Sequence, residues 1–172
     1  MTPERKIAIA EYDPRWPELF RREADRIQAA LEDRALLVEH TGSTAVPGLA
    51  AKPVIDITLA VADSGEEAAY APALTGAGYV LRIREPAWHQ HRMFKGPDTE
   101  VNLHVFSEGC PEIRRILRFR DWLRSHPSDR DLYARTKRSL AQQPWKSVDE
   151  YAIAKTAVIE EILARARNPL YS

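Results

Sequence analysis

The segment over residues 40–58, HTGSTAVPGLAAKPVIDIT, holds the side chains that most clearly point to chemistry. It is a loop of small and hydroxyl-bearing residues that runs into an apolar strand carrying one acid, Asp56. An open backbone N–H, two hydroxyls and a mobile positive charge can each contact phosphate. These groups belong to Gly42, Ser43, Thr44 and Lys52. Because Asp56 could hold a divalent cation beside them, the segment predicts a site for phosphoryl or nucleotidyl transfer.

A second candidate is His104, on a strand predicted over 100–106. Side chains alternate along a strand, so Asp56 lies on the polar face of the strand over 54–61, and His104 lies on the polar face of its own strand. If the two strands are neighbours, Asp56 and His104 could together hold a transition metal, or His104 could act as a general base. The alternative is a histidine hydrogen-bonded within a half-buried sheet. His89, His91 and His126 resemble surface or loop residues, with His91 the strongest exception because it opens a hairpin.

Basic residues elsewhere are weaker candidates. Arg92 and Lys95 lie on the predicted hairpin and could contact phosphate or simply occupy an edge strand. Five arginines crowd the helix predicted over 111–125, and Arg120 is the one we expect to close a nucleotide site. Two Tyr/Lys pairs lie on the helices that follow, and we interpret them as packing tyrosines with surface lysines rather than as a base-stacking pocket. These are Tyr133 with Lys137 and Tyr151 with Lys155.

The composition bounds the class of protein. The 172 residues are 44% hydrophobic and 29% charged, which suits one globular domain with a substantial core. Acidic and basic residues balance at 25 each, so the net charge does not indicate nucleic acid or a membrane surface as a partner. Cys110 is the single cysteine, which excludes an internal disulfide and a cysteine-rich zinc site. The chain shows no signal-like start and no apolar run long enough to span a bilayer, so we expect a cytoplasmic protein.

The elements that must position these residues follow from periodicity and from helix and turn signals. Strands are predicted over 6–10, 35–39, 54–61, 79–83, 91–95 and 100–106. One helix is predicted after Asp13-Pro14, and a second runs from the capping-box pattern over 64–67 to Gly76 or Gly78. Three more helices are predicted over 111–125, 128–142 and 147–166. The order predicts one α+β domain over 1–172, with an α/β core over 1–108 and a helical part over 109–172 packed on or beside the sheet.

Several blocks of the sequence resemble those of the GrpB family. The longest is HTGSTAVPGLAAKPVIDI over 40–57, a specific motif. Shorter matching blocks are YDPRW over 12–16, VNLHV over 101–105, FRDWLR over 119–124 and YAIAK over 151–155. The resemblance extends over roughly residues 7 to 166, and members of this family are similar to the polymerase-beta-type nucleotidyltransferase fold.

The resemblance implies a mixed sheet with flanking helices, a Gly-Ser loop for triphosphate, two carboxylates one residue apart on a strand, and a third on a neighbouring strand. Gly42, Ser43 and Asp56 match this pattern. Thr58 departs from it at the second carboxylate, and the third position falls at Asn102 or His104. One carboxylate is few for a two-metal site, so another acid would be needed. The acids to inspect are Glu39, Asp98, Glu100 and Asp121.

The leading hypothesis is a nucleotidyltransferase that binds a nucleoside triphosphate with Mg²⁺, Mn²⁺ or a transition metal and acts on an unknown acceptor. One alternative is a catalytically degenerate module that still binds a nucleotide or another phosphorylated small molecule. Another is a metal-dependent phosphoester hydrolase that uses Asp56 and His104. The sequence leaves the base, the acceptor, the metal and the oligomeric state open.

Overall fold

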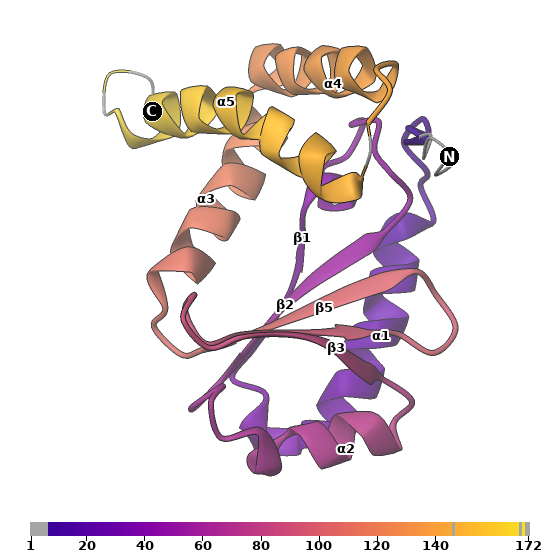
Figure 1. The fold of residues 1–172 in the computed structure, drawn as a ribbon, viewed down its shortest axis with the longest axis vertical. Coiled ribbons are helices and arrows are strands. Elements are labelled where there is room, and N and C mark those ends of the chain that lie inside the picture. Colours follow the sequence, from indigo (N-terminus) through magenta and orange to yellow (C-terminus); the bar gives the residue numbers. More distant parts are fainter. Residues whose placement is uncertain (1–6, 146, 169, 171–172) are drawn as a thin grey trace.

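A computed structural model describes residues 7–145, 147–168 and 170, and it shows a mixed sheet flanked by helices (Figure 1). The strands are β1 (Leu37–Thr41), β2 (Ile55–Val61), β3 (Val80–Glu85), β4 (His91–Lys95) and β5 (Val101–Ser107). The α-helices are α1 (Trp16–Leu31), α2 (Ala71–Gly76), α3 (Pro111–Ser125), α4 (Pro127–Ala141) and α5 (Val148–Arg167). Short 3₁₀ turns lie at Glu32–Arg34, Ser43–Ala45 and Glu67–Ala69. The α+β class predicted from the sequence is confirmed.

The sheet has the strand order β1-β2-β5-β4-β3. Strand β2 is antiparallel to β1 and parallel to β5, while β4 and β5 form the predicted antiparallel hairpin. The register sets Asp56 of β2 opposite Thr41 on one side and Asn102 on the other, and it sets Thr58 opposite His104. The sheet therefore makes β2 and β5 neighbours, which is the condition under which the sequence predicted that their polar faces meet.

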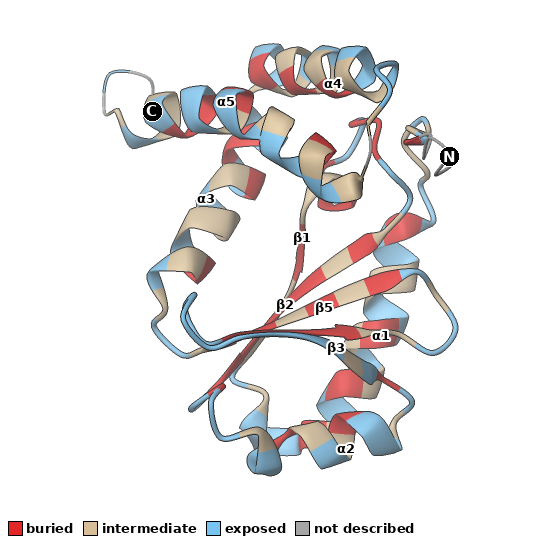
Figure 2. Cartoon of the chain, in the orientation of Figure 1, coloured by how far each residue is buried: buried red, intermediate tan, exposed pale blue. Residues whose placement is uncertain are grey.

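The two faces of the sheet bury different cores. One face carries the aliphatic side chains of β2 and β5, and it packs on α1 and α2 with Trp16, Ile27 and Leu74 in the same cluster. Strand β2 is buried at every position except Asp56, and buried and intermediate residues alternate over 101–104 of β5 (Figure 2). On the opposite face, a small cluster around Ala60 and Phe106 packs against α3. Most of this second face is therefore left to polar residues rather than to core packing.

The three C-terminal helices pack mainly on one another. Their core includes side chains from α3, α4 and α5 together with Val46 and Leu49 of the loop after β1. In Figure 1, α4 and α5 lie side by side beyond the end of the sheet where β1 ends. The predicted cap of α5 is confirmed, because Oγ of Ser147 accepts a hydrogen bond of 3.1 Å from the backbone N–H of Glu150. The helices thus hold the Gly-Ser loop against the sheet.

Two predicted elements differ from the structure. The edge strand over 6–10 is wrong beyond one bridge between Ala10 and Ala51, and residue 6 lies outside the described residues. The helix does not begin at Ser64, since its hydroxyl donates to the carbonyl of Gln90 and lies 3.0 Å from Oγ of Ser107. These distant partners compete with the local cap, so the α-helix begins only at Ala71.

Two other boundaries shift by a few residues. The first helix begins at Trp16 rather than directly after Asp13, whose side chain caps the preceding turn by accepting from the backbone N–H of Arg15. The first sheet strand spans Leu37–Thr41 instead of residues 35–39. Within the described ranges, no helix is long and apolar enough to cross a membrane.

Candidate functional site

The Gly-Ser loop passes close to the side chain of Asp56 at Gly42. Gly42 has a φ of 70°, a left-handed conformation that favours glycine. A Cβ added at this position would lie 2.6 Å from Oδ2 of Asp56, so any other residue would force the loop or the acid to shift. Ser43 then begins the short 3₁₀ turn. The loop therefore needs a glycine at position 42 both for its backbone shape and for its contact with the acid.

A pocket of about 180 Å³ lies between this loop, the end of β2 and helix α5. Ser43, Asp56 and Asn102 line it from the loop and the sheet. The remaining charged groups are three lysines, one from the loop, one from α4 and one from α5. These are Lys52, Lys137 and Lys155, and we call this the lysine pocket. Three lysines and one acid make it a positively charged pocket suited to a polyanion.

Lys137 is the most deeply placed of the three, with 2% of its surface exposed. Its Nζ donates to Oγ of Ser43 and to the carbonyl of Ala50, both at 2.9 Å, so it ties α4 to the loop. Burial, helped by the positive charges of Lys155 and Arg138, lowers the pKa of Lys137 to about 7. The amine is therefore poised to change its protonation when an anion enters the pocket.

Lys155 repeats this arrangement on α5. Each of the two lysines extends over the tyrosine one helical turn before it, with Nζ of Lys137 4.6 Å from the ring centre of Tyr133 and Nζ of Lys155 4.9 Å from that of Tyr151. Burial lowers the pKa of Lys155, while the charge of Asp56 raises it. The interpretation of these lysines as surface residues is wrong for Lys137, which is buried, and both line the lysine pocket.

Two hydroxyls of this region are already used by the fold. Oγ1 of Thr44 donates to the carbonyl of Val54 at 3.1 Å and lies 2.9 Å from Nε2 of His40. Thr58, which is fully buried, shares a 2.9 Å hydrogen bond with Oγ1 of Thr41. Thr44 lines the lysine pocket, and these contacts of its hydroxyl also shape the loop. Thr58 links β1 to β2 at the position where the resemblance implies a second carboxylate.

The two arginines proposed as phosphate contacts lie outside the lysine pocket. Nε of Arg92 donates to Glu67 at 2.6 Å, and its Nη1 donates to the carbonyl of Gln90. Nη1 of Arg120 donates to Glu39 at 2.7 Å and to the carbonyl of His40 at 3.0 Å. Both guanidinium groups are buried and neutralised by acids, so they fasten elements of the fold together.

The four acids that could have joined Asp56 do not line the lysine pocket. Glu39 and Asp121 both accept hydrogen bonds from Arg120. Asp98 pairs with Arg26 at 2.6 Å, and Glu100 lies 4.0 Å from Lys95. Asp56 is thus the single acid lining this pocket among the residues that the structure describes.

Asp56 also lines a second pocket, of about 450 Å³, on the polar face of the sheet. This pocket holds two histidines, His91 and His104, and we call it the histidine pocket. Its other lining residues include the acids Glu85 and Glu112 and the rings of Trp88 and Phe106. Asp56 therefore lies at the junction of two pockets of different character.

A chain of hydrogen-bonding groups crosses the histidine pocket. Oδ1 of Asp56 lies 3.2 Å from Nε2 of His104, Nδ1 of His104 lies 2.9 Å from Nε2 of His91, and Nδ1 of His91 lies 2.8 Å from Oε1 of Glu85. Ionised Glu85 can only accept, so Nδ1 of His91 donates to it. The chain links β2, β5, β4 and β3 in one polar row.

This chain sets the orientation of both rings. With both rings neutral, Nε2 of His91 accepts from Nδ1–H of His104, and Nε2 of His104 then presents a lone pair toward Asp56. Burial lowers the pKa of His91, which favours its neutral form. A lone pair facing a carboxylate oxygen at 3.2 Å is stable only with a proton or a cation nearby. Oδ1 of Asp56 and Nε2 of His104 can therefore bind a proton or a cation between them.

A metal ion would find two donor atoms here. Two ligands about 2.1 Å from one metal ion lie roughly 3.0–3.4 Å apart, and Oδ1 of Asp56 and Nε2 of His104 are 3.2 Å apart. Over residues 7–145, 147–168 and 170, no group of three His, Cys, Asp or Glu side chains could hold a metal ion. Further ligands would have to come from water and from the oxygens of a bound phosphate.

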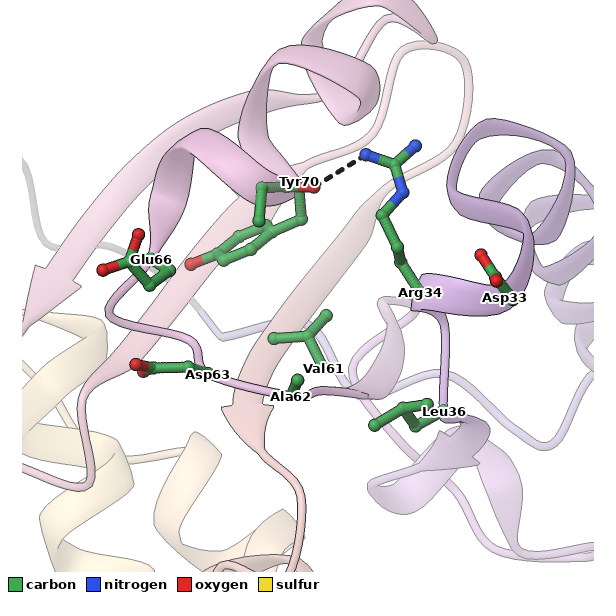
Figure 3. A pocket seen from close by; sticks show the side chains of 9 residues that line it. Asp33, Arg34, Leu36, Val61, Ala62, Asp63, Glu66 and Tyr70 are labelled. Atoms are coloured by element: carbon green, nitrogen blue, oxygen red, sulfur yellow. Dashed lines mark hydrogen bonds between the residues drawn. The ribbon is translucent and has the colours of Figure 1, made fainter.

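A third pocket, of about 410 Å³, lies at the other end of β1 and β2 (Figure 3). It is lined mainly by apolar side chains such as Leu36, Val61 and Tyr70, with acids at its edge. Figure 3 shows Arg34 turned toward the backbone near Tyr70, where Nη1 donates to the carbonyl of Ala69 at 2.7 Å. Its other guanidinium nitrogens donate to carbonyls at the end of α1. Among its described lining residues, Arg34 is the cation, and its guanidinium group is already bonded to backbone carbonyls.

Taken together, the fold and the two pockets define an α+β protein in which a Gly-Ser loop and C-terminal helices enclose a positively charged pocket beside a sheet-borne acid. The model of the GrpB protein family matches residues 6–165, and the chain belongs to this family. A UPF0157 protein of Halalkalibacterium halodurans is 62% identical over 93% of this chain and 82% of that protein. The family resemblance stated from the sequence is confirmed.

The chain is also similar to solved structures and to a longer relative. The crystal structure of GrpB from Enterococcus faecalis has a TM-score of 0.79 and 30% identity, over 94% of this chain and 100% of that chain. A more distant likeness, with a TM-score of 0.47 and 14% identity, is to the Cid1 poly(U) polymerase, over 76% of this chain and 45% of that chain. A dephospho-CoA kinase of Mycolicibacterium paratuberculosis is 31% identical over 93% of this chain, which spans 46% of that protein.

Proposed function

We propose that this protein is a nucleotidyltransferase that binds the triphosphate of a nucleoside triphosphate in the lysine pocket and a divalent metal at Asp56. The observation that carries the proposal is the convergence of Ser43 and three lysines with Asp56 on one concave pocket. A triphosphate would replace the mutual repulsion of the lysines with attraction. Lys52, which lines this pocket, would contact the terminal phosphates. Gly42 lines the neighbouring histidine pocket, so its backbone N–H would contact a phosphate only near Asp56.

The reaction needs a hydroxyl that approaches from the side of Asp56 opposite the lysines. The hydroxyl oxygen bonds to the α-phosphorus, the bond from the α-phosphorus to the bridging oxygen breaks, and pyrophosphate leaves with that electron pair. The hydroxyl proton passes to Nε2 of His104, whose lone pair the chain through His91 and Glu85 holds toward Asp56. Lys137 and Lys155 stabilise the charge that accumulates on pyrophosphate.

Asp56 and His104 fit a metal site of modest strength. Asp56 would hold Mg²⁺ or Mn²⁺ together with phosphate oxygens and water, which leaves Nε2 of His104 free to take the hydroxyl proton. A softer metal bound to Nε2 of His104 would remove that base. Such an ion supplies charge neutralisation at the phosphorus under attack. Asp56 then has two separate tasks, since Oδ2 faces the loop at Gly42 and Oδ1 faces His104.

Thermal unfolding with nucleoside triphosphates tests the proposal directly. Because a ligand that binds only the native state raises stability by mass action, ATP, GTP, CTP and UTP are each added with Mg²⁺ or Mn²⁺ and the midpoint is measured. We expect at least one triphosphate to raise the midpoint in wild type, and Lys137→Met to reduce that shift. No shift with any of the four at saturating concentration would contradict the proposal.

A second candidate is a nucleotide-binding module without transferase activity. Its specific support is Thr58, which is buried and hydrogen-bonded where the resemblance implies a second carboxylate. The relatives also include dephospho-CoA kinases in which a segment similar to this chain is less than half of the protein, as an accessory module would be. This candidate predicts nucleotide binding that survives both Asp56→Asn and chelation of metal. The transferase predicts that both abolish turnover.

A further inference from the structure

We infer that the histidine pocket is the acceptor site, and that it takes a small hydroxylated molecule carrying an ammonium group. The inference rests on the proposed function, since it assigns the second substrate of the same reaction. Its first support is position. Asp56 lines both pockets, so a molecule in the histidine pocket and a triphosphate in the lysine pocket would both lie beside this side chain.

The charge of the histidine pocket is the reverse of that of the lysine pocket. Three acids line it, Asp56, Glu85 and Glu112, and none of its described lining residues is a lysine or an arginine. Glu112 has only 12% of its side chain exposed, and its Oε1 accepts a 3.2 Å hydrogen bond from Arg115. Glu85 is exposed, whereas Asp56 and Glu112 are partly buried, and all three carboxylates would repel a second phosphate and attract a cation. An anionic acceptor is therefore disfavoured on this side of Asp56.

The rings of the pocket favour the same ligand. Trp88 is 43% exposed although it is a large apolar residue, and its ring lies edge-on to those of His91 and Phe106. An exposed tryptophan held between buried rings presents its indole to whatever enters the pocket. Indole is the best aromatic partner for an ammonium group through cation–π attraction. Carboxylates and an indole together form a site for an organic cation.

The opposite end of the pocket indicates why the ligand should carry a hydroxyl group. There, Nε2 of His104 and Oδ1 of Asp56 are the polar atoms that can accept a proton from a substrate. A volume of about 450 Å³ accommodates a molecule of about the size of a monosaccharide. A hydroxyl at Asp56 and an ammonium group near Glu112 and Trp88 would thus lie on one ligand.

Three pyranoses of similar size separate the effect of charge from that of shape. Glucosamine, glucose and glucuronate are titrated at neutral pH, and binding is followed through the indole ¹H–¹⁵N signal of Trp88, which is assigned with Trp88→Phe. We expect glucosamine to shift this signal with at least tenfold higher affinity than glucose, and glucuronate to leave it unchanged. Equal or stronger binding of glucuronate, or no shift with glucosamine at concentrations that saturate a millimolar site, would overturn the inference.

Matched variants locate the cation. Glu112→Gln keeps the size of the side chain and should weaken glucosamine binding about tenfold, as loss of a charged contact does. Glu108→Gln changes an exposed acid outside the pocket and should leave it unchanged. If both variants bind glucosamine as wild type does, the charge complementarity is absent and the inference fails.

The titrations are made without nucleotide, so the outcome is independent of the lysine pocket. Triphosphate binding that depends on Lys137, with no binding of the amine, would overturn the acceptor assignment and leave the proposed function standing. Amine binding at Trp88 with no triphosphate binding would remove the proposed function and retain the histidine pocket as a cation site.

Discussion

The lysine pocket and the histidine pocket meet at Asp56 but are built by different parts of the chain. The cations of the lysine pocket come from the loop after β1 and from α4 and α5. The polar row of the histidine pocket comes from four adjacent strands, β2, β5, β4 and β3. Sheet register therefore fixes one pocket, and helix packing fixes the other. We expect the histidine pocket to hold its shape and the lysine pocket to respond to its ligand.

Asp56→Asn should give the largest effect, because this residue belongs to both pockets. Asparagine keeps the size of the side chain but loses the charge that would hold a metal, so we expect turnover to fall by about 10³-fold. Pyrophosphate release with the preferred triphosphate and an amino-alcohol acceptor measures it. Unchanged turnover would show that Asp56 is not the metal ligand, whereas wild type without any turnover would favour the binding module.

Gly42→Ala should damage the contact between the loop and the sheet, and Gly48→Ala is its matched control. Both glycines have a positive φ, at 70° and 80°, so each substitution should cost about 1–2 kcal/mol of stability. Only Gly42→Ala also places a methyl group 2.6 Å from Oδ2 of Asp56. Urea unfolding should show an additional loss of about 1–3 kcal/mol for Gly42→Ala. Equal losses would mean that the loop moves away from Asp56 easily.

Lys137→Met should weaken triphosphate binding without affecting the histidine pocket. The variant retains the apolar stem and removes a charged donor, so we expect a loss of about 10- to 100-fold in affinity. Isothermal titration with the triphosphate measures the loss, and Arg135→Met, an exposed change on the same helix, should bind normally. Glucosamine binding at Trp88 should be the same in both variants. A parallel loss of amine binding would show that the two pockets are not independent.

The Asp56–His104 pair of the histidine pocket could be predicted from the sequence, whereas the sequence pattern groups buried His91 with surface or loop residues. Strand alternation put Asp56 and His104 on polar faces, and the register of β2 with β5 joins those faces. The predicted cap at Ser147 is also present, because it depends only on neighbouring residues. The division at residues 108 and 109 stays a prediction, as do the roles given to the site residues Gly42, Ser43, Thr44, Lys52, Asp56, Arg92, His104 and Arg120.

The lysine pocket could not be predicted in the same way. Lys137 contacts Ser43 and Ala50, which are 94 and 87 residues away in the sequence, and no local pattern encodes such a contact. A lysine one turn after a tyrosine on an amphipathic helix normally faces solvent. Long-range contacts also explain why no helix begins at Ser64. Its hydroxyl bonds to Gln90 and Ser107 instead of capping a helix.

Proton uptake on nucleotide binding should distinguish the two pockets further. The pKa of Lys137 is lowered from 10.5 to about 7 in the free protein, so above pH 7 the native state binds fewer protons than the unfolded state. Stability from this group therefore rises with pH between about 7 and 10.5. A bound triphosphate should raise the pKa again, so binding near pH 8 should take up about one proton. Titration calorimetry in two buffers of different ionisation enthalpy measures this uptake.

The control for this experiment is Lys137→Met, in which most of the uptake should disappear. A residual fraction would belong to Lys155, whose pKa burial also lowers. Uptake that is the same in wild type and Lys137→Met would show that the amine of Lys137 does not sense the ligand. Amine binding in the histidine pocket should not show this uptake.

Thr58→Val should have the smallest effect and tests whether Thr58 serves structure alone. The variant loses the 2.9 Å hydrogen bond to Oγ1 of Thr41 but keeps the shape of a buried side chain, so we expect a loss of about 1 kcal/mol in stability. Chemical denaturation measures this loss, and affinity for triphosphate and glucosamine should remain that of wild type. Because Thr58 lies opposite His104 in the register, a fall in turnover at unchanged stability would instead mean that its hydroxyl acts on the Asp56–His104 pair. The hydroxyl would then do part of the work that a second carboxylate does in the pattern implied by the family resemblance.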